Sequence, residues 1–167
     1  MSIRNQLRRC AWIGALGLLA AGSASAQLIT NAVGPGNQFI AGGALVPLLG
    51  MTTAPFFNAA NQRFVASFSA ECAVNAPAGN HTAFTDIDIV VLNGAGAVVQ
   101  TLAPTLGGTD AFCTANGTPV FDGWTRASAT VVGGVGLAAG FYRVQVRGRV
   151  PIPFSASYGD RSLVVSR

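Results

Sequence analysis

Apolar and polar side chains alternate along most of the chain, the pattern of half-buried β-strands. The clearest case is RFVASFSAECAV, residues 63–74. Its apolar face carries Phe64, Ala66, Phe68, Ala70, Cys72 and Val74. Its other face carries Val65, Ser67, Ser69 and Glu71. The segment is therefore predicted to be a strand with one side on the core.

The same period recurs in TDIDIVVL, residues 85–92, and a turn at residues 93–96 then predicts a hairpin with residues 97–103. Further strands are predicted at residues 124–132, 141–150 and 161–166. Turn residues separate them: Asn116-Gly117, Asp122-Gly123, Gly133-Gly134 and Ala139-Gly140. Short strands joined by Gly-rich turns predict an all-β protein, an antiparallel β-sandwich of jelly-roll-like form.

The N-terminus departs from this pattern and divides the chain into three parts. Residues 1–26 combine three arginines, the apolar run AWIGALGLLAA and the small-residue sequence Ala24-Ser25-Ala26, which together predict a cleaved secretory signal peptide. Residues 27–43 are expected to be a Gly-rich leader, and residues 44–167 a single β-sandwich domain. The protein is therefore expected to be secreted or periplasmic. Its composition, rich in Ala, Gly, Val and Arg without Lys, is typical of a bacterial protein.

Removal of the signal peptide changes the charge. Seven arginines then face six acids, which leaves a net charge of about +1 instead of +4. Nucleic-acid binding needs a dense cationic surface, so it is not expected. The mature chain has no further apolar run long enough to span a membrane. No cofactor or phosphate-binding motif occurs, and no enzyme is expected.

Two cysteines remain, Cys72 and Cys113, and in an exported protein such a pair predicts an intradomain disulfide. The alternative is a nucleophilic Cys72 with His81 as its base, which requires a free thiol. A single histidine in a loop also argues against a metal site, because such sites draw on three or four ligands. We therefore expect a disulfide, a solvated His81 and no metal.

The remaining candidates are charged and aromatic side chains. Asp86 and Asp88 share a strand face and are either a catalytic carboxylate pair or an outward polar face. Three arginines share one face of FYRVQVRGRV, residues 141–150, and either bind an anionic polymer or sugar or pair across strands with these aspartates. We expect the pairing, with each pair exposed and stabilising by about 0–1 kcal/mol. The ligand-binding candidates are Trp124, Arg126, Arg143, Arg147 and Arg149.

The segments at residues 70–80, 85–91, 110–128 and 138–150 resemble a group of small secreted bacterial β-sandwich proteins of unassigned function. The ending AAGFYRVQVRGRV is similar to jelly-roll modules of phage tails and cell-surface appendages. The resemblance implies the fold and transfers no functional residues. The expected function is an exported, non-catalytic β-sandwich with a structural or surface-binding role, its partner unknown. The alternative is a small carbohydrate- or anion-binding module that uses Trp124 and the arginine face, with a glycan or cell-surface polymer as partner.

Overall fold

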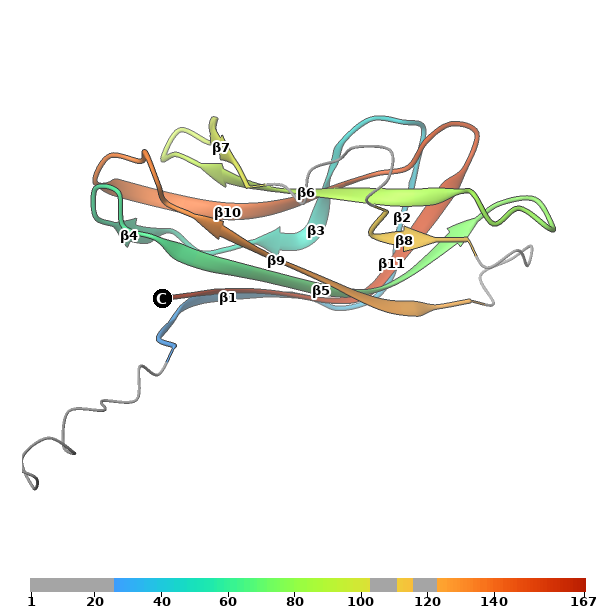
Figure 1. Ribbon diagram of the computed structural model, residues 1–167, viewed down its shortest axis with the longest axis horizontal. Helices are drawn as coiled ribbons and strands as arrows, with labels where there is room; N and C mark the ends of the chain where they lie inside the picture. The colour runs from blue at the N-terminus through green and yellow to red at the C-terminus, as the bar shows by residue number, and fades with distance from the viewer. Residues whose placement is uncertain (1–25, 103–110, 116–122) are drawn as a thin grey trace, which may run out of the picture.

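The computed structural model describes residues 26–102, 111–115 and 123–167 of the chain. The expected signal peptide, up to residue 25, and the expected turn at Asn116-Gly117 lie outside these ranges. The described residues form two antiparallel sheets that pack face to face (Figure 1).

We call these two layers sheet A and sheet B. Sheet A has the order β1 (Leu28–Gly34), β11 (Ser155–Ser166), β5 (Phe64–Asn75) and β9 (Thr125–Gly133), and β2 (Gln38–Ala41) also pairs with β11. Sheet B has the order β3 (Val46–Thr52), β10 (Gly140–Arg149), β6 (Phe84–Leu92) and β7 (Val98–Thr101). Two short strands extend sheet B, namely β4 (Phe56–Asn58) on β10 and β8 (Cys113–Thr114) on β6.

Neighbouring strands are rarely consecutive in sequence, because the chain repeatedly crosses from one sheet to the other. It leaves sheet A after β5, returns at β9, crosses again to β10 and ends in sheet A with β11. This crossing gives the jelly-roll-like arrangement that the spacing of short strands predicts. The antiparallel β-sandwich expected from the sequence is confirmed.

The core lies between the sheets and is formed by alternate residues of the long strands. In β5 the predicted apolar face is buried, and Phe64 packs edge-on against Phe56 with ring centroids 5.4 Å apart. In β10 the buried face includes Tyr142, Val144 and Val146. The period of two therefore identified the buried face of both strands correctly.

The Cys72–Cys113 disulfide joins the two layers. Cys72 belongs to β5 in sheet A and Cys113 to β8 in sheet B, and their Cα atoms are 6.3 Å apart. The bond spans 41 positions of sequence, a loop whose closure stabilises the fold by about 4 kcal/mol in the chain-entropy account. The predicted disulfide is confirmed, so neither cysteine is a free thiol nucleophile.

The expected Gly-rich leader is not a separate segment. Within residues 27–43, β1 and β2 both pair with β11, and Ile29, Ala32 and Ile40 pack against or belong to the core. The glycines occupy the connections: Gly36, Gly42 and Gly43 have positive φ. Glycine-rich composition here therefore marks turns between edge strands, and the described domain includes this region.

Candidate functional site

The arginine face of β10 pairs with the aspartates of β6, as expected. The register sets Arg147 opposite Asp88 and Arg149 opposite Asp86. Arg147 donates through Nε to Oδ1 of Asp88 at 2.8 Å and through Nη2 to Oδ2, a two-pronged contact. Arg149 donates to Oδ2 of Asp86 at 3.1 Å. These two arginines are therefore already neutralised within the fold.

The burial of these pairs differs from the exposed polar face expected. Asp86 is fully buried and Asp88 is 3% exposed. The side chains of Arg147 and Arg149 lie directly against these two carboxylates and contribute to covering them. The hydrogen bond to Asp88 raises the pKa of Arg147, which keeps its guanidinium charged. The two aspartates therefore form ion pairs with arginines on the neighbouring strand. This structural role explains their presence without a catalytic function.

Arg143 lies on the same strand face, opposite Leu92, and forms no ion pair among the described residues. It does not lie near Trp124 and Arg126, because β10 belongs to sheet B whereas Arg126 is on β9 in sheet A. The single surface of Trp124 and the β10 arginines that the sequence suggested does not exist. Arg126 instead pairs with Glu71, directly opposite on β5, at 2.9 Å.

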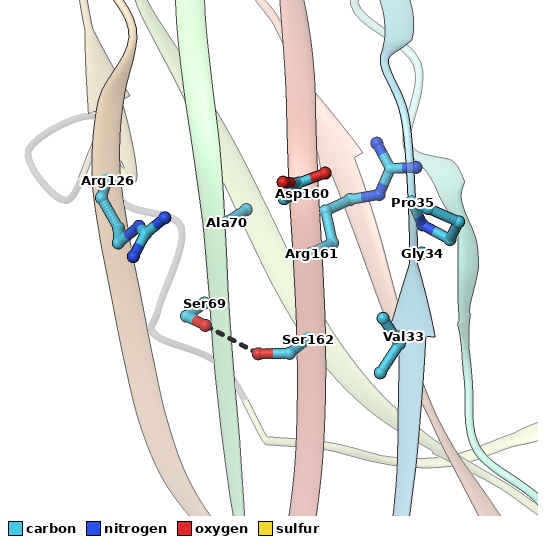
Figure 2. A pocket seen from close by; sticks show the side chains of 9 residues that line it. All are labelled: Val33, Gly34, Pro35, Ser69, Ala70, Arg126, Asp160, Arg161 and Ser162. Atoms are coloured by element: carbon cyan, nitrogen blue, oxygen red, sulfur yellow. Dashed lines mark hydrogen bonds between the residues drawn. The ribbon is translucent and has the colours of Figure 1, made fainter.

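A depression lies on the outer surface of sheet A (Figure 2). Its volume is about 440 Å³. The lining residues come from β1, β5, β9 and β11 and from the turn after β1: Val33, Gly34, Pro35, Ser69, Ala70, Arg126, Asp160, Arg161 and Ser162. In its floor the hydroxyls of Ser69 and Ser162 are hydrogen-bonded at 2.8 Å. The lining is therefore mostly small and polar.

The depression coincides with an irregularity in the sheet. Tyr158 pairs with Cys72 and Arg161 with Ala70, so Gly159 and Asp160 together oppose the single residue Glu71. This β-bulge keeps Tyr158 and Arg161 buried and leaves Asp160 exposed. Beside the bulge, residues 35–37 connect β1 to β2 and do not pair with β11. Bulges of this kind re-aim side chains and are common next to binding sites.

Trp124 lies against the bulge, beside Gly159, and is not itself among the residues that line the depression. A Cβ atom on Gly159 would be 3.1 Å from Cζ3 of Trp124 and 3.2 Å from Cβ of Glu71. The glycine therefore allows the indole to lie close to β11, where it remains 39% exposed. The exposed indole and Glu71 thus lie on either side of Gly159 in the bulge, next to Arg126 and Asp160 of the depression.

Sequence reasoning proposed Trp124 and Arg126 but missed Gly159, Asp160, Ser69 and Ser162. A glycine inside an otherwise regular strand is a known signal of a bulge, and Tyr158-Gly159-Asp160 carried it. The serines gave no signal: alternation assigned Ser69 only to the outward face of its strand, and Ser162 lay in a predicted strand to which no face was assigned.

Other candidates do not converge on a site. His81 is exposed in the connection between β5 and β6. Across the described ranges, no three His, Cys, Asp or Glu side chains are grouped so that they could hold a metal ion. The part of the chain that the structure describes contains no helix long and apolar enough to cross a membrane.

No family model and no curated protein matches the sequence. Among solved structures, the chain is similar to the VP2 subviral particle of infectious bursal disease virus, with a TM-score of 0.49 and 13% identity. The match covers 86% of this chain and 33% of the viral chain. The chain thus spans about a third of the length of that protein, and so distant a likeness carries no functional argument.

Proposed function

We propose that the protein is an exported, non-catalytic β-sandwich that binds a saccharide in the depression on the outer face of sheet A. The observation that carries the proposal is the exposed Trp124, held over Gly159 beside the Glu71–Arg126 pair. An indole face stacks on the apolar C–H face of a sugar ring, and such amphipathic rings are suited to sites that are partly wet. Carboxylate, guanidinium and serine hydroxyl groups supply the polar contacts that orient a hydroxylated ligand.

Binding without catalysis is favoured by the state of the reactive groups. Asp86 and Asp88 are bonded to arginines, and the two cysteines form a disulfide. Glu71 accepts a hydrogen bond from Arg126, and carboxylate oxygens of this kind can also accept hydrogen bonds from sugar hydroxyls. The shallow, open form of the site suits part of a surface polymer.

Export is supported by the N-terminal sequence and by the disulfide, since oxidising compartments maintain such bonds. We expect cleavage after Ala26 and delivery to the periplasm or the cell exterior. Intact-mass analysis of the exported protein tests this, and a membrane-retained species of full length would contradict it.

The binding test is a glycan array probed with residues 27–167, followed by titration of each positive sugar. Trp124→Ala should weaken binding by about tenfold or more, because stacking of this kind contributes about 1–3 kcal/mol. Phe141→Ala is the matched control, since Phe141 is an aromatic residue 64% exposed on the other sheet. Equal losses in both variants, or no sugar bound, would leave a purely structural role as the better explanation. Release of smaller sugars during the titration would contradict the absence of catalysis.

A further inference from the structure

The edge strand β9 is open on one side. Within the described residues it pairs only with β5, and Figure 2 shows it at the margin of sheet A. Its core-facing side chains Ala127, Ala129 and Val131 are only partly buried. The core-facing side chains of the neighbouring β5, from Phe64 to Cys72, are at most 1% exposed. Solvent therefore reaches β9 along its free side.

β9 lacks the features that protect the other edge strands. Natural edge strands are short, bulged or interrupted by proline or lysine, because an exposed row of backbone N–H and C=O groups readily pairs with another strand. The pairing of β1 with β11, of β3 with β10 and of β7 with β6 is irregular, and β3 also contains Pro47. The strands β2, β4 and β8 have four residues or fewer. By contrast, β9 has nine residues in unbroken register with β5 and contains neither proline nor lysine.

The charge of β9 is compatible with pairing to a copy of itself. Antiparallel pairing about a two-fold axis at Ala129, the middle of the strand, would include all nine residues. Arg126 is the only charged residue of β9, and it would lie opposite the partner's Val132. The two copies of Arg126 would then be about 20 Å apart, beyond the screening length at physiological ionic strength. Charge repulsion therefore does not oppose this pairing.

Both faces of β9 would gain contacts in this arrangement. On the outer face, Ser128 would lie opposite the partner's Thr130. Hydroxyls already bond across strands on this face, since Ser67 and Thr130 are 3.1 Å apart, and such pairs stabilise sheets. On the core face, Ala127 would lie opposite the partner's Val131. Each copy would therefore cover apolar surface that the other leaves partly exposed.

We infer that the free edge of β9 is an interaction surface and that its partner is a second copy of this chain, paired antiparallel through β9. The two five-stranded A sheets then form one continuous sheet. Two-fold pairing uses the edge of each copy once, so it closes into a dimer and does not extend into a fibre. One strand pair buries less surface than a standard protein interface, so the dimer is reversible.

The dimer has a consequence for ligand binding. Opposed residues of an antiparallel pair project to the same side of the sheet, so the outer faces of both A sheets lie on one side. The two depressions then share one surface, and a long polymer can occupy both with increased avidity. The dimer itself does not depend on the proposed saccharide binding and is tested without sugar.

Sedimentation velocity of residues 27–167 from about 5 to 500 µM tests the dimer, and we expect a monomer–dimer equilibrium in this range. Thr130→Lys should weaken dimerisation about tenfold or more, because it puts a cation on the edge and the two-fold axis repeats the change. Ser67→Lys is the matched control. It adds the same charge to the same face and removes the same hydrogen bond, but it lies one strand inside the edge. It should leave the dissociation constant within about threefold of the wild-type value.

Hydrogen exchange of the wild type locates the contact. The amides of residues 125–133 that do not bond to β5 should exchange rapidly at low protein concentration and about tenfold or more slowly at high concentration. This measurement decides the question even if Thr130→Lys does not fold.

Three results would overturn the inference: a monomer at every concentration, a dimer with unchanged exchange in β9, or equal weakening by the two lysine substitutions. The last result would place the contact on the outer face of the sheet. Growth beyond the dimer would contradict the closed two-fold pairing. None of these outcomes affects the saccharide proposal, because that site lies within one copy.

Discussion

Removing Arg147 from its pair with Asp88 should destabilise the fold several times more than removing Arg126 from its pair with Glu71, although both pairs join neighbouring strands. The Asp88 side chain is 4% exposed and that of Arg147 24% exposed, whereas Arg126 and Glu71 are 75% and 38% exposed. Removing one partner of a buried pair costs about 3–5 kcal/mol, since an uncompensated charge remains. Because water reaches Arg147 in part, we expect Arg147→Met to cost about 3 kcal/mol. Arg126→Met should cost about 0–1 kcal/mol.

Urea unfolding of residues 27–167, followed by Trp124 fluorescence, measures both losses. Total stability of such domains is about 5–15 kcal/mol, so a loss of about 3 kcal/mol shifts the midpoint clearly. The double variant Arg147→Met with Asp88→Leu should recover most of the loss, because it leaves no buried charge behind. Similar losses in Arg147→Met and Arg126→Met, or no recovery in the double variant, would refute the reasoning from burial.

Two further predictions concern the core. Thiol labelling of residues 27–167 under denaturing, non-reducing conditions should find no free cysteine, and two labelled thiols would contradict the bond. Replacing Cys72 and Cys113 by alanine should lower the free energy of unfolding by about 2–5 kcal/mol. Burial raises the pKa of Tyr158 in the folded state, whereas the unfolded chain ionises near pH 10. The stability that this difference provides is therefore complete below about pH 10 and decreases as the pH rises above it. Unfolding free energies measured from pH 8 to 11 should fall less steeply in Tyr158→Phe, and parallel slopes would exclude Tyr158 as the cause.

Local pattern was sufficient for much of the fold. Alternation in residues 63–74 and 141–150 identified the buried faces of β5 and β10, because successive side chains of any strand point to opposite sides. Two cysteines outside the expected signal peptide were sufficient to predict the disulfide. The pairing of Arg147 and Arg149 with Asp88 and Asp86 also followed from charge and spacing.

The tertiary structure decided what lies beside and above each strand. Alternation placed Asp86 and Asp88 on an outward face, but both are buried, and strand order brings the arginine side chains of β10 directly against them. Trp124 and Arg126 were separated from the β10 arginines because the chain crosses between sheets from β9 to β10.

The candidate site itself arises from a local irregularity between distant segments. The sequence determined which segments have one apolar and one polar face, because the side chains of neighbouring residues in a strand point to opposite sides of the sheet. Only folding could bring the β11 bulge, the break between β1 and β2, and Trp124 to one place, because they are joined by strand pairing between the two ends of the chain. The burial of Arg161 has the same origin: the bulge turns it inward, and β1, from the opposite end of the domain, covers it.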